Sequence, residues 1–323
     1  MFMPSLLTAI LSLASPSPQV AGSSEAPDPP ALVLAGRRIL HVGAHPDDES
    51  TFAPMLAEAC RFNGARCHLV VAQDADSWGC LMGLGLEDRD KCSEMRRMEV
   101  SASAANLNAT HEFFGWREGR YNWNDAGVES NLAGLAREQG GRSRLVDRFM
   151  QTLESFRPEV VLAFDPRHGT TCHPNHRAVV RLLLEAVDRL EPRQRPEVWF
   201  GSDFAVPGAP EEIARITDGF GIVRWPGDRA PVVWYDMTAP LPDGRTAYDY
   251  LVDALRLNAT QFGEVATGRL TPSPDPSHRR LPLVRRADID PAQAGLCEER
   301  APGFLRNVES MPDDVFVKAV IGR

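Results

Sequence analysis

Short apolar runs rich in β-branched residues recur along this chain, and most precede a longer stretch in which apolar residues have helical spacing. The runs expected to form strands are Arg38–Val42, Cys67–Gln73, His111–Trp116, Phe156–Phe164 and Glu197–Phe204. The stretches expected to form helices are Thr51–Asn63, Glu94–Leu107, Leu132–Phe156 and Arg177–Leu190. This alternation predicts an α/β fold: a Rossmann-like, mostly parallel sheet with helices on both faces.

The pattern changes after Pro207, where loops with Gly and Pro separate short apolar runs such as Val232–Tyr235. We expect residues 37–206 to form the Rossmann-like catalytic core. Residues 207–323 are expected to complete the same domain as an irregular, substrate-facing segment. Within that segment the spacing predicts a helix over Tyr248–Gln261 and a strand over Val315–Ile321.

The first 36 residues contain no Lys or Arg and include an apolar run, Leu6–Leu13, that is too short to span a bilayer. Small residues suited to cleavage follow at Ser12–Ala14 and Val20–Gly22, and Ser23–Pro30 forms a Pro/Ser-rich tether. This arrangement favours a signal peptide and a secreted or periplasmic protein without a transmembrane segment. The alternative is a disordered N-terminal extension of a cytoplasmic protein.

Composition narrows the class of protein. The chain has 323 residues, 43% hydrophobic and 24% charged, as in an ordinary soluble globular protein large enough for one α/β domain with additions. Its net charge is −9, its pI is about 5.4, and no basic block exceeds two residues. These features argue against nucleic acid and anionic membrane surfaces as partners. They leave the oligomeric state open.

The six cysteines are Cys60, Cys67, Cys80, Cys92, Cys172 and Cys297. Cys80 and Cys92 flank a loop rich in Gly and acidic residues that a disulfide would close. Unpaired buried thiols are the alternative, and the remaining pairings stay open. Because no Cys-x-x-Cys is present, a structural zinc site is not expected.

The first predicted strand ends in reactive groups. Arg38–Val42 leads into His45-Pro46-Asp47-Asp48-Glu49, where Pro46 stiffens the turn before the helix. In so tight a turn, His45 and Asp48 can bend back toward one point with Asp47 beside it. An imidazole and a carboxylate are a ligand pair suited to Zn²⁺, and a third protein ligand would leave one position for water. No Gly-x-Gly-x-x-Gly follows the strand, which argues against a dinucleotide cofactor.

The strand that ends at Phe164 repeats this design. It leads into Asp165-Pro166, and Cys172-His173-Pro174-Asn175-His176 then opens the next helical pattern. Two histidines three residues apart at a helix start can face the same side, so both could reach one metal ion. The sequence therefore predicts a metal centre to which two strand ends contribute.

These motifs resemble a known family. Ala44–Glu49, followed about 130 residues on by His173–His176, is similar to the signature of the PIG-L/LmbE-like zinc-dependent de-N-acetylases. Weaker matches at Arg96–Val100 and Ala254–Gln261 support the resemblance, which covers roughly residues 37–262.

The resemblance implies an enzyme that uses one Zn²⁺ per chain to hydrolyse the N-acetyl amide of a substrate containing N-acetylglucosamine, releasing acetate and a free amine. Carried over to this chain, it makes His45, Asp48 and His176 the zinc ligands. Asp47 would be the general base, and His173 would polarise or protonate at the tetrahedral intermediate. The substrate stays open among glycolipids, thiol-linked glycosides, glycopeptides and oligosaccharides. The alternatives are a metal-dependent phosphoesterase, which typically assembles two metals, and a non-catalytic sugar-binding protein.

Five further residues are candidates for contact with the substrate: Arg96, Trp78, Trp116, His168 and Asp165. Arg96 resembles the family's substrate-contacting arginine, and a surface ion pair with Glu99 is the alternative. The two tryptophans could stack on a sugar ring or be packed in the ordinary way.

The chain departs from the family at two positions. The family usually has Asp where Asn175 stands, so a carboxylate that could hold His173 protonated is missing, and Asp165 or Asp74 is left as a possible substitute. Cys172 stands where a small residue, often Gly, precedes the His-Pro pair.

Overall fold

The computed structural model describes residues 32–74, 88–201, 232–262, 280–293, 297, 303–312 and 315. Within these residues one sheet has the strand order β3-β2-β1-β4-β5-β7-β6. The strands are β1 (Arg38–Gly43), β2 (Arg66–Gln73), β3 (Ala109–Trp116), β4 (Val160–Phe164), β5 (Glu197–Gly201), β6 (Val232–Asp236) and β7 (Arg280–Arg285). Neighbours among β1 to β5 are parallel, whereas β7 is antiparallel to β5 and β6. The predicted mostly parallel, Rossmann-like sheet is confirmed.

Five helices of the described chain are longer than two turns: α2 (Arg89–Asn106), α3 (Asp125–Gln139), α4 (Arg142–Phe156), α6 (Pro174–Arg189) and α8 (Ala247–Leu257). Shorter pieces are η1 (Asp48–Phe52), α1 (Ala53–Leu56), η2 (Ala57–Phe62), α5 (Gly169–Cys172), η3 (Pro192–Gln194), η5 (Arg286–Asp288) and η6 (Gly303–Ser310). The helix expected over Leu132–Phe156 is divided between α3 and α4. Gly140 ends α3 with a φ of 78°, which glycine adopts at little cost.

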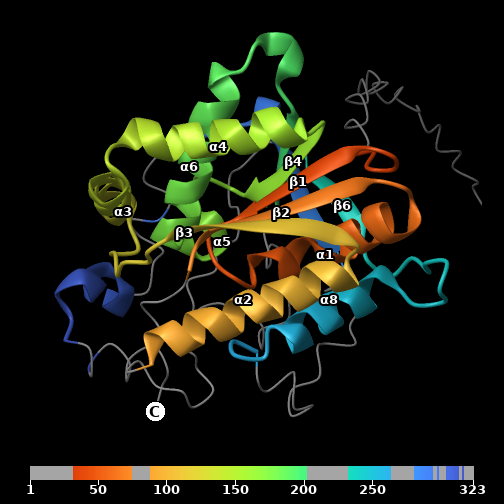
Figure 1. The fold of residues 1–323 in the computed structure, drawn as a ribbon, viewed down its shortest axis with the longest axis horizontal. Coiled ribbons are helices and arrows are strands. Elements are labelled where there is room, and N and C mark those ends of the chain that lie inside the picture. The colour runs from red at the N-terminus through yellow and green to blue at the C-terminus, as the bar shows by residue number, and fades with distance from the viewer. Residues whose placement is uncertain are drawn as a thin grey trace, which may run out of the picture. The chain divides into compact units, whose positions relative to one another are not determined.

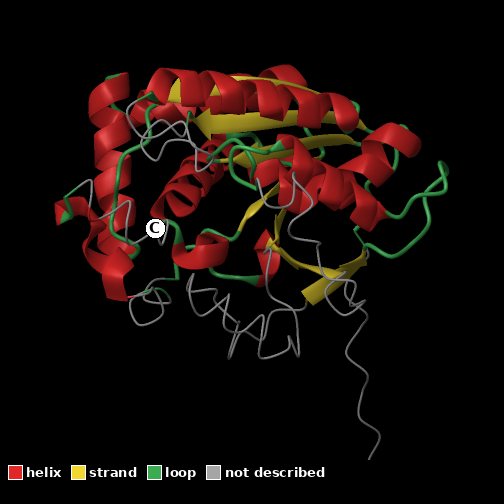
Figure 2. Ribbon diagram, turned by 90° about the horizontal axis from the view of Figure 1, so that it is seen from below, coloured by secondary structure: helices red, strands yellow, loops and turns green. Residues whose placement is uncertain are grey.

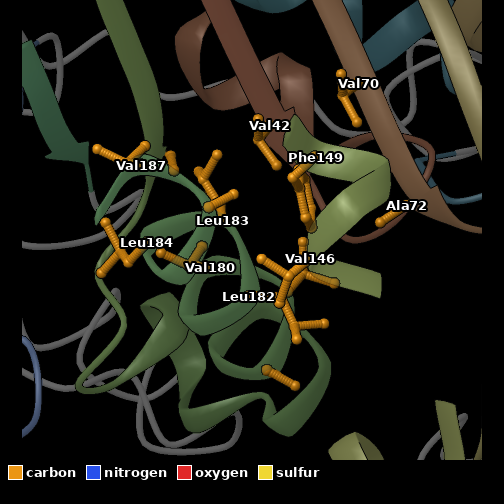
Figure 3. Close-up of a cluster of buried hydrophobic side chains, with 14 of the residues drawn as sticks. Val42, Val70, Ala72, Val146, Phe149, Val180, Leu182, Leu183, Leu184 and Val187 are labelled. Carbon is orange, nitrogen blue, oxygen red and sulfur yellow. The ribbon is translucent and has the colours of Figure 1, made fainter. Parts of the chain in front are cut away.

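Helices cover both faces of the sheet, with α3, α4 and α6 on one side and α1, α2 and α8 on the other (Figure 1). Side chains alternate along a strand, so Val42 faces the first group of helices and Ile39 the second. Figure 3 shows the first cluster, where Val42 lies near Phe149 of α4 and Leu183 of α6. Burying each such side chain contributes about 1.5–3 kcal/mol, so both faces hold the strands in place.

The strands twist relative to one another along the sheet (Figure 2), and the last two come from the segment expected to be irregular. Val284 of β7 pairs with Phe200 of β5 on one side and with Val232 of β6 on the other. The strand expected over Val315–Ile321 lies outside the described residues apart from Val315. None of the described helices combines the length and apolar character needed to cross a membrane.

The strand order reverses between β1 and β4. β1 is followed outward by β2 and β3, and β4 is followed in the opposite direction by β5. β1 and β4 are themselves paired from Ile39–Val160 to Val42–Ala163. Open α/β sheets bind ligands outside the carboxyl ends of the strands at such a switch point. Both motifs singled out in the sequence follow these two strands.

Candidate metal centre

The turn after β1 folds back on itself at Gly43. A Cβ atom at Gly43 would lie 2.7 Å from Asp48 Cβ, so only glycine lets Asp48 approach this closely. Asp48 Oδ2 accepts hydrogen bonds from the backbone N–H groups of Ala44 and His45, at 2.6 and 2.9 Å. These bonds fix the carboxylate and leave Oδ1 facing His176, 3.2 Å from its Nε2.

Atoms of His45, Asp48 and His176 converge outside the ends of β1 and β4. His45 Nδ1 lies 3.0 Å from His176 Nε2 and 4.0 Å from Asp48 Oδ1. His176 Nδ1 is 2.9 Å from the Gly169 carbonyl and donates to it, which turns the Nε2 lone pair toward the centre. Ligands at the usual zinc distances of ~2.0–2.1 Å, arranged tetrahedrally, lie roughly 3.3 Å apart. The donor set therefore fits a single zinc ion.

The charges of His45, Asp48 and His176, called the trio below, suit the binding of a cation. Burial alone would raise the pKa of Asp48, but the adjacent imidazoles of His176 and His45 bring it well below its usual range. Burial alone would likewise lower the pKa of His176, yet Asp48 raises it to about 9. Each group thus stabilises an opposite charge on the other, and a bound metal ion would take the place of the imidazolium proton.

His173 lies beside these groups and completes a cluster. The ligand atoms of His45, His173 and His176 all lie within 4.8 Å of one another, the one such group among the described residues. His173 Nδ1 accepts a hydrogen bond from the Asn175 backbone N–H at the start of α6, so the neutral ring carries its proton on Nε2. Burial, reinforced by His176 and His45, holds the pKa of His173 well below its usual value. His173 is therefore a neutral donor in this structure.

Asp47 occupies a strained position beside the trio. Its φ is 110°, in the left-handed region that costs a non-glycine residue about 1–3 kcal/mol. Arg96 donates to Asp47 Oδ2 at 2.8 Å and to the Pro46 carbonyl, while Glu49 Oε2 accepts from the Asp47 N–H at 3.1 Å. Burial raises the pKa of Asp47 and Arg96 opposes that rise. These contacts hold a carboxylate suited to proton transfer at the edge of the site.

Arg96, expected to touch the substrate, is 4% exposed and bonds to Asp47 and Pro46. It is neither on the surface nor paired with Glu99, which instead accepts from the backbone N–H and hydroxyl of Thr260 beyond α8. Asn258, at the end of α8, donates to Glu49 at 2.7 Å. The two weaker motifs thus meet beneath the turn that carries Asp47.

The other residues expected to contact substrate have different positions. Trp78 lies outside the described residues. Trp116 is 3% exposed and packs edge-on against Phe149 in the core, as in the alternative of ordinary packing, and its sugar contact stays a prediction. Asp165 and His168 are fully buried, and Asp165 forms a two-pronged ion pair with Arg167. A substrate contact for these two stays a prediction.

Several residues near the centre were missed from the sequence. The Asn175 side chain points away from His173: its Nδ2 lies 3.1 Å from His45 Nε2 and 3.0 Å from Glu118 Oε1. Glu118 Oε1 is also 3.0 Å from His45 Nε2. Trp123 packs against the His173 ring with centroids 4.7 Å apart. Glu118 follows an apolar strand, as Asp47 and Asp165 do, and that shared pattern was the one signal available.

Disulfides tie the second motif to the C-terminal segment. Cys172, directly before His173, is bonded to Cys297, and Cys60 is bonded to Cys67. Cys92 is also disulfide-bonded, and Cys80, its expected partner, lies outside the described residues. No described cysteine is free, so the alternative of unpaired thiols does not hold for them.

Comparison with known proteins finds relatives among the de-N-acetylases. Residues 40–187 match the family described as PIG-L: GlcNAc-PI de-N-acetylase. A 1D-myo-inositol 2-acetamido-2-deoxy-alpha-D-glucopyranoside deacetylase from Saccharomonospora viridis is 32% identical over 167 residues, covering 47% of this chain and 59% of that protein. A protein of the same name from Mycobacterium sp. is 29% identical over 266 residues, covering 75% and 80%. Residues 40–187 of the chain are thus similar to the PIG-L de-N-acetylases.

Among solved structures, the A40926 pseudoaglycone deacetylase Dbv21 has the same fold. Its TM-score is 0.50 at 14% identity, and the superposition covers 79% of this chain and 99% of that one. The alignment with the Saccharomonospora viridis relative spans less than two thirds of that protein.

Proposed function

We propose that this protein is a zinc-dependent hydrolase that removes the acetyl group from a substrate containing N-acetylglucosamine, releasing acetate and a free amine. The observation that carries the proposal is the convergence of His45 Nδ1, Asp48 Oδ1 and His176 Nε2 beside the Asp47 carboxylate. The similarity of residues 40–187 to the PIG-L family supports the reaction class, and the relatives named as deacetylases of an N-acetylglucosaminyl inositol support the substrate class.

His45, Asp48 and His176 would hold one zinc ion. Asp48 is preferred to His173 as the third ligand because its Oδ1 already lies 3.2 Å from His176 Nε2 and because a carboxylate compensates the metal charge. His173 Nδ1 is engaged at the start of α6, so the proton of the neutral ring is on Nε2. Bound zinc lowers the pKa of a coordinated water to about 7 and polarises a carbonyl group.

The residues of the chain would move the protons. Asp47, held by Arg96, would accept the proton of the attacking water. His173 would donate a hydrogen bond from Nε2 to the carbonyl oxygen as negative charge develops, and Asp47 would pass the proton taken from the water to the departing amine. Arg96 takes up one oxygen of Asp47, and the other oxygen would accept the proton.

The two alternatives have weaker support. A phosphoesterase with two metals needs a second set of ligands, and the described residues contain one cluster of candidate ligands. A sugar-binding protein needs no general base, whereas Asp47 is held in a strained conformation by Arg96 and Glu49.

Export to an oxidising compartment is also part of the proposal. The disulfides Cys60–Cys67 and Cys172–Cys297 support it, because disulfides persist outside the cytosol. N-terminal sequencing of protein secreted by a suitable host should find a mature start between about residue 15 and residue 31, the range set by the apolar run and its small-residue sites. Intact Met1 in cytosolic protein alone would argue for the cytoplasmic alternative.

Acetate release from a panel of N-acetylglucosaminides tests the reaction. Wild type should release acetate and a primary amine in equal amounts, and Asp47→Asn should lose this activity while keeping its zinc. Asp147→Asn is the matched control, since it makes the same change on the exposed face of α4. Phosphate release from phosphoesters without acetate release would favour the phosphoesterase instead.

A further inference from the structure

Behind His45, on the side away from Asp48, lies a buried polar group formed by Glu118, Asn175 and Asn131. Glu118 Oε1 is 3.0 Å from His45 Nε2 and accepts from Asn175 Nδ2 at 3.0 Å. Asn175 Oδ1 in turn accepts from Asn131 Nδ2 at 2.7 Å. Glu118 and Asn175 are 6% and 1% exposed, and Asn131 is fully buried. Burying a polar side chain costs free energy unless it is hydrogen-bonded, so these contacts stabilise the group.

The orientation of the Asn175 amide follows from its neighbours. A carboxylate can only accept hydrogen bonds, so the atom of Asn175 that faces Glu118 must be the NH₂ group. The same NH₂ group lies 3.1 Å from His45 Nε2. His45 Nε2 therefore has two neighbours of opposite kind: Glu118 Oε1, which can only accept a hydrogen bond, and Asn175 Nδ2, which can only donate one.

These two neighbours favour opposite tautomers of His45. Asn175 alone would donate to Nε2 and so favour a ring that carries its proton on Nδ1. That proton would face Asp48 and His176 and would occupy the lone pair needed for a metal. Glu118 accepts from Nε2–H and favours the ring whose Nδ1 lone pair is free. It also accepts a hydrogen bond from the Asn175 amide, the donor that competes for the ring.

Charge balance points the same way. A divalent ion held by two neutral imidazoles and Asp48 retains one positive charge. Asp47 is already paired with Arg96. Glu118, whose side chain is 3% exposed, supplies the second negative charge next to a ligand.

We infer that Glu118 is a positioning residue for the metal centre: it fixes the His45 tautomer that presents Nδ1 to zinc, and Asn175 is an amide because a carboxylate at that position would lie 3.0 Å from Glu118. This inference rests on the zinc site of the proposed function. It places the carboxylate partner of the centre at residue 118, on the segment after β3.

Zinc affinity of the purified protein, measured by competition with a chromogenic chelator, tests the role of Glu118. Glu118→Met removes the acceptor and the charge with little change in side-chain length, and it should weaken zinc binding by about 10–100-fold, the range for lost partners of metal-binding histidines. Glu129→Met makes the same substitution at an exposed carboxylate of α3 and should bind zinc as wild type does.

A charge-swap variant supplies the decisive comparison. In Glu118→Met/Asn175→Asp, a carboxylate takes the place of the amide 3.1 Å from His45 Nε2, with Asn131 still able to donate to its other oxygen. Zinc affinity should return to within about threefold of wild type, a recovery that a purely structural role would not give. The inference is overturned if Glu118→Met binds zinc as tightly as wild type, or if the double variant binds no better than Glu118→Met.

Two further measurements keep the result interpretable. Should Glu118→Met fail to fold, Glu118→Gln and Glu118→Gln/Asn175→Asp are compared in the same assay, and equal zinc affinity of that pair overturns the inference. If wild type itself binds no zinc, the proposed function fails. If wild type binds zinc and Glu118→Met binds it equally well, only the role of Glu118 fails.

Discussion

Removal of the Cys172–Cys297 disulfide is the change whose effect can best be worked out from the structure. The bridge anchors a loop in which Thr170 and Cys172 have φ values of 70° and 64°. Each left-handed non-glycine residue costs about 1–2 kcal/mol, so the loop stores roughly 2–4 kcal/mol. The bridge and the buried Arg167–Asp165 ion pair hold it in this conformation. His173 follows directly, so relaxation of the loop would move the metal centre.

The stability lost when a disulfide is removed depends on the length of chain that the disulfide closes. Cys172 and Cys297 are 125 positions apart, whereas Cys60 and Cys67 are 7 apart. By chain entropy, the long closure stabilises the folded state by about 5 kcal/mol and the short one by about 2 kcal/mol. At roughly 2–4 °C per kcal/mol, Cys172→Ala/Cys297→Ala should lower Tm by up to ~10–20 °C, less the part of the loop strain that relaxation releases.

Calorimetry of the metal-free protein and zinc titration together form the assay. Cys60→Ala/Cys67→Ala is the matched control, because its bridge lies between η2 and β2, outside the metal centre. The Cys172 and Cys297 double variant should lose about twice the stability of the control and bind zinc more weakly. The control should keep the zinc affinity of wild type. Equal losses of Tm in the two variants, with unchanged zinc affinity in both, would refute this reasoning.

Three other predictions concern the site and one half-buried carboxylate. Asp47→Asn should retain zinc and lose turnover by about 10²–10⁴-fold in steady-state kinetics, and loss of zinc would make Asp47 a ligand. His176→Ala should lose stoichiometric zinc by metal analysis, and wild-type binding would exclude His176 from the site. Burial alone would raise the pKa of Glu112, but hydrogen bonds from His68, Thr152 and Arg148 outweigh it and lower the pKa to about 2. Because the folded pKa lies below the unfolded value, this stability is present above about pH 4.5 and is lost as pH falls toward 2. After discounting for solvent screening, this contribution is roughly 1–2 kcal/mol. The free energy of unfolding, measured with urea, should therefore fall more between pH 6 and pH 3 for wild type than for Glu112→Gln.

The site residues that the sequence predicts are those that follow directly after a strand. His45, Asp48 and His176 converge because β1 and β4 are neighbours at the switch point, and parallel strands bring their carboxyl ends to one edge. The apolar patterns located β1 and β4 because both strands are buried on both faces.

The parts that were missed depend on tertiary contacts that no local pattern encodes. Glu118 reaches His45 from the segment after β3, a strand that lies beyond β2 in the sheet. Trp116 ends a strand and could face either the site or the core, and the packing of α4 decides for the core. β7 contains Pro282 and is a strand through its pairing with β5 and β6. The bridge from Cys172 joins positions 125 residues apart.

Stepwise addition of zinc to metal-free enzyme, with acetate release from an N-acetylglucosaminide as the readout, tests the central claim most directly. The metal-free protein should be inactive, and activity should rise linearly to a plateau at one zinc per chain, since His45, Asp48 and His176 form a single site. Full acetate release without metal, or a plateau only at two zinc ions per chain, would contradict the account.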